Sequence, residues 1–295
     1  MKLGLGTAQL GMDYGVANRN GQTSMAEARE ILWAAELNGI SVIDTAAVYG
    51  DSERVLGMLL PKQHQHTFRI ITKLPGLLPQ DGSGISSNEV VNRLMESLLR
   101  LRQEGVYGVI LHRAEDLLSV YGDEVMKGLQ KCKRLGLASK IGISVYAEDR
   151  VEELISRYPI DLIQVPVNLF DQRLVQNGLL SRCKSLGIEV HARSVFLQGL
   201  LCMDPLELPA YFRPHTEQIL RFHSFVKEKG MSPVEAAMSY VNDLPVIDTF
   251  VCGVNRQEQL LQLIALASKS SHGFDYSDFA SSEPSLLNPS LWKIS

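Results

Sequence analysis

Short β-branched runs alternate along the chain with longer segments in which apolar residues recur at helical spacing. Residues 91, 94, 98 and 101, for example, are all valine or leucine and lie on one face of a helix. Eight strands separated by helices favour a (β/α)8 barrel. The predicted strands centre on residues 2–7, 40–44, 68–73, 106–112, 138–143, 160–165, 188–194 and 247–252.

Polar signals indicate where several helices begin and end. Ser24-x-x-Glu27 and Ser86-x-x-Glu89 have the form of a capping box. Ser232-Pro233-x-Glu235 predicts an additional helix before the last strand, with proline at its tolerated first position. A glycine that suits the left-handed end of a helix precedes four strands. These glycines are Gly39, Gly105, Gly136 and Gly187.

Residues 1–295 are expected to form a single barrel domain, because no linker or low-complexity segment divides the chain. A doubly wound sheet is the alternative. It is disfavoured because Gly4-Leu5-Gly6 is followed by Gln9 where a dinucleotide-binding turn needs a third glycine. The tail over residues 271–295 is expected to be irregular and to pack over the barrel, since it carries four aromatic residues.

Composition narrows the classes of function. The chain is 45% hydrophobic and 21% charged, with a net charge of −4, so nucleic acid is not an expected partner. No apolar run reaches the length of a membrane span. The four cysteines form no C-x-x-C pair, which favours a reduced, cytoplasmic protein.

His64 and His66 lie in a polar stretch and are interpreted as surface residues, so no metal is expected. The sequence does not predict an oligomeric state.

Ionisable side chains follow three successive predicted strands. Asp44 and Tyr49 come just after the second strand, Lys73 ends the third and His112 ends the fourth. The loops after the strands form the active face of a barrel, so these four residues are expected at one mouth.

These four residue types suit the protonation of a carbonyl oxygen. A free tyrosine is a weak acid near neutral pH, and a lysine ammonium beside it is expected to lower its pKa. Asp44 would keep Lys73 charged, Tyr49 would donate the proton, and His112 would orient the substrate. Because no side chain supplies hydride, this chemistry implies a nicotinamide cofactor.

Residues 44–57 read DTAAVYGDSERVLG. This segment resembles the signature of the aldo-keto reductase family, D-T-A-x-x-Y-G-x-S-E-x-x-L-G, and Lys73 and His112 match its remaining catalytic positions. The likeness extends over nearly the full chain, through residues 4–11, 141–144, 163–165, 198–201 and 253–260.

The resemblance implies NADP(H) bound across the barrel mouth, with NAD(H) less favoured. Ser144 and Gln164 would hold the carboxamide, and Thr7 would lie near the ribose. The pyrophosphate would meet Ser194 and the turn that begins Gln198-Gly199-Leu200, and Gly253 would lie at the last strand end. The 2′-phosphate would meet Asn255, Arg256 and Gln259. A guanidinium near a helix N-terminus is itself a good phosphate ligand.

Three departures from the family pattern stand out. Val145 replaces an asparagine that contacts the carboxamide, and Gln262-Leu263 replaces a Glu-Asn pair near the adenine. Arg193 takes the place of an aromatic ring that stacks on the nicotinamide, and a guanidinium can stack in the same way.

The sequence therefore predicts an NADPH-dependent reductase of a small aldehyde or ketone, reversible as an alcohol or sugar dehydrogenase. The alternatives are a cofactor-binding regulatory subunit resembling potassium-channel β subunits, and a scaffold without turnover. An anionic substrate would need a cation, for which four arginines are candidates, and two aromatic residues are candidates for shaping the pocket. These residues are Arg113, Arg173, Arg193 and Arg213, with Tyr14 and Trp292.

Overall fold

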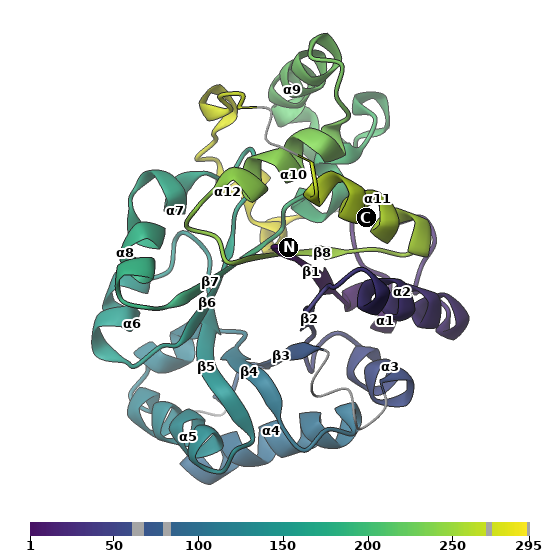
Figure 1. Ribbon diagram of the computed structural model, residues 1–295. Helices are drawn as coiled ribbons and strands as arrows, with labels where there is room; N and C mark the ends of the chain where they lie inside the picture. The colour runs from purple at the N-terminus through teal and green to yellow at the C-terminus, as the bar shows by residue number, and fades with distance from the viewer. Residues whose placement is uncertain (61–67, 79–83, 270–272, 294–295) are drawn as a thin grey trace.

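Eight parallel strands close into a barrel in a computed structural model that describes residues 1–60, 68–78, 84–269 and 273–293. Each strand pairs with its neighbours in the chain, and β1 pairs with β8 (Figure 1). The predicted (β/α)8 barrel is therefore confirmed, and each strand lies within two residues of its predicted bounds. The strands are β1 (Leu3–Gly6), β2 (Val42–Asp44), β3 (Arg69–Leu74), β4 (Val106–Leu111), β5 (Ala138–Ser144), β6 (Leu162–Pro166), β7 (Glu189–Arg193) and β8 (Thr249–Gly253).

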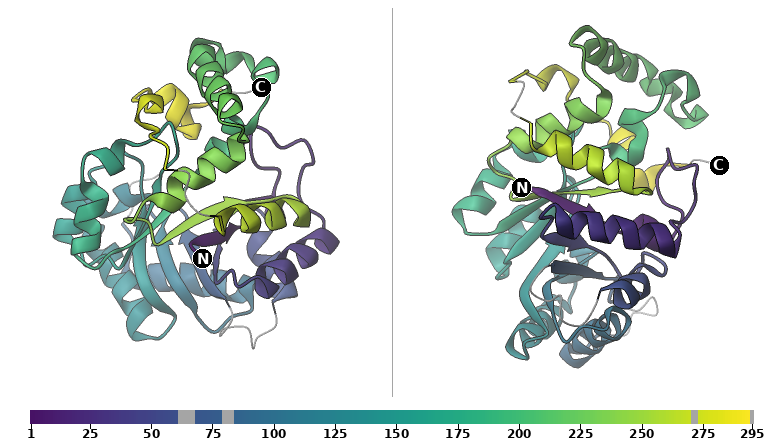
Figure 2. Two further views of the ribbon diagram at one scale, coloured as in Figure 1. Left: turned by 45° about the horizontal axis from the view of Figure 1, so that its top comes forward. Right: turned by 45° about the vertical axis from the view of Figure 1, so that its right-hand side comes forward.

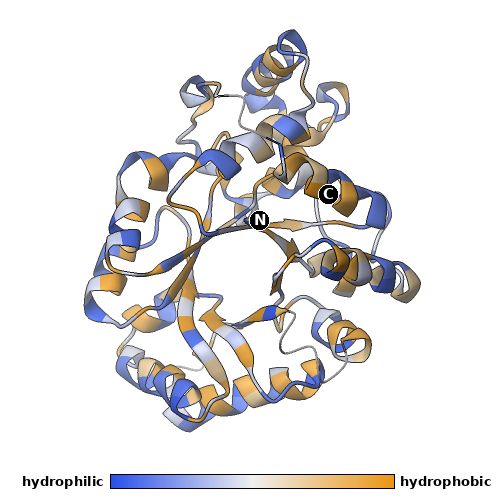
Figure 3. Ribbon diagram, in the orientation of Figure 1, coloured by the Kyte–Doolittle hydropathy of each residue, from blue (hydrophilic) through white to orange (hydrophobic). Residues whose placement is uncertain are grey.

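Helices surround the barrel and turn their apolar sides toward it (Figures 2 and 3). The additional helix predicted before the last strand is α10, and α9, which the sequence did not predict, precedes it. The helices are α1 (Ala8–Gly11), α2 (Met25–Leu37), α3 (Ser52–Leu59), α4 (Ser87–Leu101), α5 (Gly122–Arg134), α6 (Val151–Arg157), α7 (Arg173–Gln176), α8 (Leu179–Ser185), α9 (Thr216–Glu228), α10 (Pro233–Asp243), α11 (Gln257–Ala267) and α12 (Pro284–Leu287).

The predicted capping boxes differ in outcome. Ser86 and Glu89 form the complete reciprocal box at α4. Ser24 accepts a hydrogen bond from the Glu27 amide at α2, but the Glu27 carboxylate accepts from Gln257 N of α11 at 2.6 Å. The second box is therefore half-formed, because the acid that would complete it caps a neighbouring helix.

Three of the four predicted helix-ending glycines have a positive φ: Gly39 at 72°, Gly136 at 71° and Gly187 at 75°. The prediction is wrong for Gly105. At the end of α4, Arg102 takes the left-handed conformation instead, with a φ of 53°. Gly105 has a different reason to be glycine, since a Cβ there would lie 2.9 Å from the carbonyl oxygen of Gly136.

The C-terminal tail packs against α9 and the turns around it. Phe279 contacts Phe222 and Phe225 of α9 edge to face. Trp292 packs at 90° on Phe212, with ring centroids 4.9 Å apart. The tail thus buries aromatic area against the helices that precede β8.

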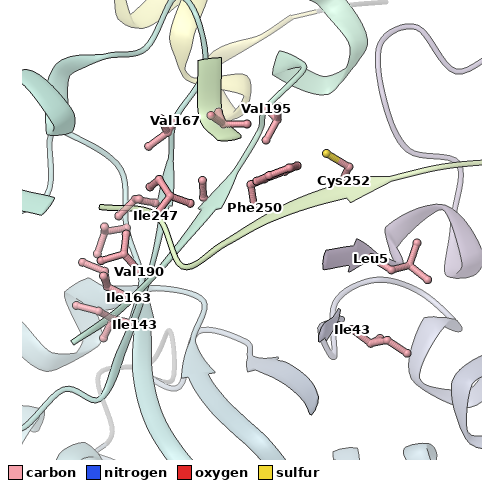
Figure 4. Packing of buried hydrophobic residues seen from close by; sticks show 14 of the residues in the cluster. Leu5, Ile43, Ile143, Ile163, Val167, Val190, Val195, Ile247, Phe250 and Cys252 are labelled. Carbon is pink, nitrogen blue, oxygen red and sulfur yellow. The ribbon is translucent and has the colours of Figure 1, made fainter. Parts of the chain in front are cut away.

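Apolar side chains from the strands and helices form one large core, part of which Figure 4 shows around β6, β7 and β8. A smaller buried cluster comprises Val42, Ile71, Ile110 and Leu162. Each of these precedes a predicted site residue by two positions, so strand alternation puts both on one face of the sheet. The cluster forms an apolar layer directly beneath the site.

Candidate active site

The ends of β2 and β3 bring an acid and a base into contact. Lys73 Nζ lies 2.5 Å from Asp44 Oδ2 and also donates to the carbonyl oxygen of Thr45 at 3.2 Å. Lys73 is fully buried, and Asp44 is 4% exposed. A buried ammonium requires a paired carboxylate, so each of these residues accounts for the position of the other.

Tyr49 lies against this ion pair, on the loop between β2 and α3. Lys73 Nζ is 4.8 Å from the centroid of its ring. The His112 ring stands at 89° to it, with centroids 6.1 Å apart. The structure therefore brings together all four residues that the sequence proposed as catalytic.

The loop that carries Tyr49 is fixed by close backbone packing. Asp51 N donates to the carbonyl oxygen of Gly11 at 3.1 Å. Gly50 has a φ of 54°, and a Cβ there would lie 2.2 Å from the same Gly11 oxygen. Only glycine fits this position, which explains why glycine follows the tyrosine.

Ser52 and Glu53 are the first residues of α3, and they also anchor the residues around the site. Ser52 Oγ bonds to Thr7 Oγ1 at 2.8 Å, and Thr7 N donates to the Asp44 carbonyl oxygen. Glu53 accepts from Thr72 Oγ1 at 2.5 Å and from Arg100 Nε at 2.7 Å. These buried bonds fix the end of β2 and its neighbours, a role that the sequence alone did not reveal.

The environment raises the pKa of Tyr49 well above its ordinary value. Burial is the main cause and the Asp44 carboxylate adds to it, while Arg193 acts in the opposite direction. The expectation of a lowered pKa is therefore not met, because desolvation and the nearby carboxylate outweigh the effect of Arg193. Burial likewise lowers the pKa of Lys73, against the opposing effect of Asp44.

His112 is neutral at physiological pH. Burial, Lys73 and Arg193 together lower its pKa to about 4. A neutral imidazole can donate one hydrogen bond and accept another, so it can orient a carbonyl oxygen without carrying charge.

A cavity of about 560 Å³ opens beside these side chains, a size typical of small-molecule sites. Tyr14 lines it, whereas Trp292, the described tail residues and the buried Lys73 do not. Twelve of the sixteen predicted site residues line the cavity: Thr7, Asp44, Tyr49, His112, Gln164, Arg193, Ser194, Gln198, Gly199, Gly253, Asn255 and Gln259.

Besides Lys73, three predicted cofactor residues lie outside the cavity wall. Leu200 is fully buried in the core. Ser144 is buried and paired in register with Gln164. Arg256 is exposed at the N-terminus of α11. Tyr146, which was not predicted, lines the cavity. Tyr146 follows the end of β5 by two residues. The argument that residues just after the strands line the barrel mouth would therefore have identified it.

The N-terminus of α11 already has polar partners. Gln259 Oε1 accepts from Asn255 N at 2.8 Å and from Arg256 N at 3.2 Å, and Glu27 caps Gln257 N. A phosphate at this turn would have the Arg256 side chain available but would also meet the Glu27 carboxylate.

The fold and site define a barrel with a buried lysine–aspartate pair under a tyrosine. A family model described as "Aldo/keto reductase family" matches residues 2–280, and the chain belongs to this family. It is thus one of the NAD(P)H-dependent oxidoreductases that act on small carbonyl compounds.

Three comparisons place the chain among known proteins. It is 22% identical over 299 residues to aldo-keto reductase YhdN of Bacillus subtilis, covering 94% of this chain and 88% of that one. It is 26% identical to an NADH-specific methylglyoxal reductase of Escherichia coli, over 68% and 65% of the two chains. The holo structure of AKR11C1 from Bacillus halodurans superposes with a TM-score of 0.71 at 21% identity, covering 92% and 87%. This last likeness shows the fold.

Gln164 gives a structural test of whether a nicotinamide fits. Its Nε2 donates to Asp44 Oδ1 at 2.7 Å, which leaves Oε1 buried without a partner among the described residues. An unpaired buried acceptor is costly, and a carboxamide N–H would satisfy it. The residues present therefore fit the group.

The described residues were also searched for metal-binding clusters and for membrane-spanning helices. They include no cluster of three or more His, Cys, Asp or Glu residues placed to hold a metal ion. No helix in the described part of the chain is long and apolar enough to cross a membrane. His64 and His66 lie outside the described residues.

Proposed function

We propose that this chain reduces an aldehyde or ketone with NAD(P)H and that Tyr49 donates the proton. The observation that carries the proposal is the buried Lys73–Asp44 pair against the Tyr49 ring, with His112 beside it and the cavity in front. The same residues would serve the reverse reaction, the oxidation of an alcohol or sugar.

The raised pKa of Tyr49 is compatible with this role. The phenol stays protonated throughout the neutral range, so a proton is always available. Addition of hydride to the carbonyl carbon would break the C=O π bond and leave an alkoxide on the oxygen, and an alkoxide is much more basic than a phenolate. Proton transfer from Tyr49 to that oxygen is therefore downhill even without a lowered pKa.

Each remaining residue has a positioning role. The Asp44 carboxylate fixes the Lys73 ammonium beneath the Tyr49 ring, and neutral His112 donates a hydrogen bond that directs the carbonyl oxygen toward the phenol. A bound nicotinamide supplies the hydride. Gln164 would accept from its carboxamide, and Thr7, Ser194 and the 198–199 turn would line the rest of the dinucleotide.

We propose NADP(H) as the preferred cofactor, with the exposed Arg256 meeting the 2′-phosphate. The nearby Glu27 carboxylate opposes that phosphate, so we expect a modest preference over NAD(H). A cytoplasmic location stays a prediction from the cysteine pattern.

The test is to mix the purified protein with NADPH and a panel of aldehydes, ketones, sugars and phosphorylated carbonyl compounds. Consumption of NADPH that depends on the carbonyl compound is expected. NADPH binding without turnover across the panel would favour a regulatory subunit. If neither NADPH nor NADH binds, both the reductase and the regulatory subunit are rejected.

A further inference from the structure

Four arginines are candidates for binding an anionic substrate, and the structure separates them. Arg173 is held by both carboxylate oxygens of Asp171 at 2.8 Å and by Glu148. Arg113 and Arg213 are exposed. Arg193 alone among them lines the cavity, and the described wall contains no lysine or other arginine.

The Arg193 guanidinium is held by neutral groups. It donates to the carbonyl oxygen of Val145 at 3.1 Å and to Ser194 Oγ at 3.3 Å, and its Cζ lies 4.4 Å from the centroid of the Tyr146 ring. A guanidinium has five N–H donors, so these two acceptors leave donors unused. No carboxylate among the described residues lies within ion-pair distance of it.

The charge around Arg193 is not balanced within the cavity. The one acid among the described wall residues is Asp44, and Lys73 already neutralises it. Tyr14 is protonated, because burial raises its pKa to about 12, and His112 is neutral. The described wall therefore presents one positive charge that has no ion-pair partner in the wall, next to the phenol rings of Tyr14, Tyr49 and Tyr146.

Arg193 also lies close to the reacting groups. It ends β7, and its charge acts on both Tyr49 and His112. A ligand oxygen on the guanidinium would therefore belong to the molecule that is being reduced or to a group next to the nicotinamide.

We propose that Arg193 binds a carboxylate or phosphate group carried by the substrate, close to the carbonyl carbon that is reduced. This proposal rests on the proposed function, since it names the substrate class of the same site. A planar fork of donors suits both anions, and a charge-assisted pair contributes about 1.5–3 kcal/mol, or at least about tenfold in binding.

The test uses two aldehydes of nearly equal shape, para-formylbenzoate and its neutral amide, para-formylbenzamide. Wild-type protein is expected to reduce the carboxylate with a kcat/KM at least about tenfold higher. Arg193→Gln should remove this preference, because it should lower the kcat/KM for the carboxylate at least about tenfold more than the kcat/KM for the amide. Arg213→Gln, which changes an exposed arginine away from the cavity, should keep it.

A second measurement does not need turnover. Benzoate binding to the protein in the presence of saturating NADP⁺, measured by calorimetry, should be lost in Arg193→Gln and retained in Arg213→Gln. If neither these aldehydes nor any compound of the carbonyl panel is reduced but benzoate binding needs Arg193, the anion site stands and the reductase proposal fails.

Two results would overturn the proposal. One is equal reduction of both aldehydes by wild type, together with benzoate binding that does not depend on Arg193. The other is a variant that loses NADPH affinity and both aldehyde activities to the same extent, which would assign Arg193 to the cofactor alone.

Discussion

Lys73 meets Tyr49 at the face of its ring, 4.8 Å from the centroid, while Asp44 holds the ammonium at 2.5 Å. The sequence predicted the three partners but not the direction of the pKa, because burial and the local geometry decide it. In this arrangement the Lys73–Asp44 pair holds the Tyr49 ring in place, and the phenol can donate a proton but is not made more acidic. The chemistry then depends on where the carbonyl oxygen is held.

The pKa values predict a flat pH profile. His112, with a pKa lowered to about 4, is neutral above about pH 5, and Tyr49 stays protonated because its pKa is raised. We expect kcat/KM for carbonyl reduction to change less than about threefold between pH 5.5 and 9. The measurement is a pH series with a neutral substrate. An ionisation near pH 6.5 that disappears in His112→Gln would contradict this assignment.

The structural roles of some residues cannot be inferred from their spacing in the sequence. Gly105 looks like Gly39 in sequence, but its neighbour across space is the carbonyl oxygen of Gly136. Glu27 stands where a capping box needs it, yet its carboxylate caps α11. Both depend on contacts between elements far apart in the chain, which local patterns do not encode.

At the scale of elements, the junction of α2 and α11 sets the electrostatics of the proposed 2′-phosphate site. Glu27→Gln keeps an acceptor for Gln257 N but removes the charge. It should tighten NADPH by about two- to fivefold and leave NADH unchanged, and Arg256→Ala should weaken NADPH more than NADH.

Fluorescence titration of both cofactors measures these ratios. The matched control is Glu30→Gln, an exposed acid one turn further along α2. Equal effects of either variant on NADH and NADPH would show that the 2′-phosphate lies elsewhere.

The opposite end of the barrel holds a polar network that stabilises the strands. Glu189 at the start of β7 accepts from Tyr107 OH and interacts with His191, both at 2.7 Å, and pairs with Lys140. Burial opposes its ionisation, but these hydrogen bonds outweigh burial and hold its pKa well below 4.5.

Because the folded pKa is depressed, Glu189 stabilises the protein above about pH 4.5, and this contribution is lost as the pH falls further. Glu189→Gln should lower the free energy of unfolding by about 1–3 kcal/mol at pH 7, and by less at pH 3.5. Urea denaturation at the two pH values measures this. Exposed Glu228→Gln is the control, and an equal loss at both pH values would reject the ionic role.

At the scale of the whole molecule, most of the fold follows from the pattern of apolar and polar residues along the chain. Eight apolar runs predict the barrel. Three of these runs end in or just before a polar residue, and this predicts the mouth where Asp44, Lys73 and His112 meet. The sequence did not predict the shape of the cavity or the exclusion of Arg256 from its wall, because these depend on loop paths. It also left four arginines equal, and only the fold distinguishes Arg193.

The most direct measurement compares Tyr49→Phe with wild type for NADPH affinity and for carbonyl reduction in the same preparation. The ring and its contact with Lys73 remain, so the Kd for NADPH should change less than about threefold, while kcat should fall at least about 100-fold. Tyr121→Phe, outside the cavity wall, should match wild type. A Tyr49→Phe protein that reduces carbonyl compounds at the wild-type rate would contradict the role of this phenol as proton donor.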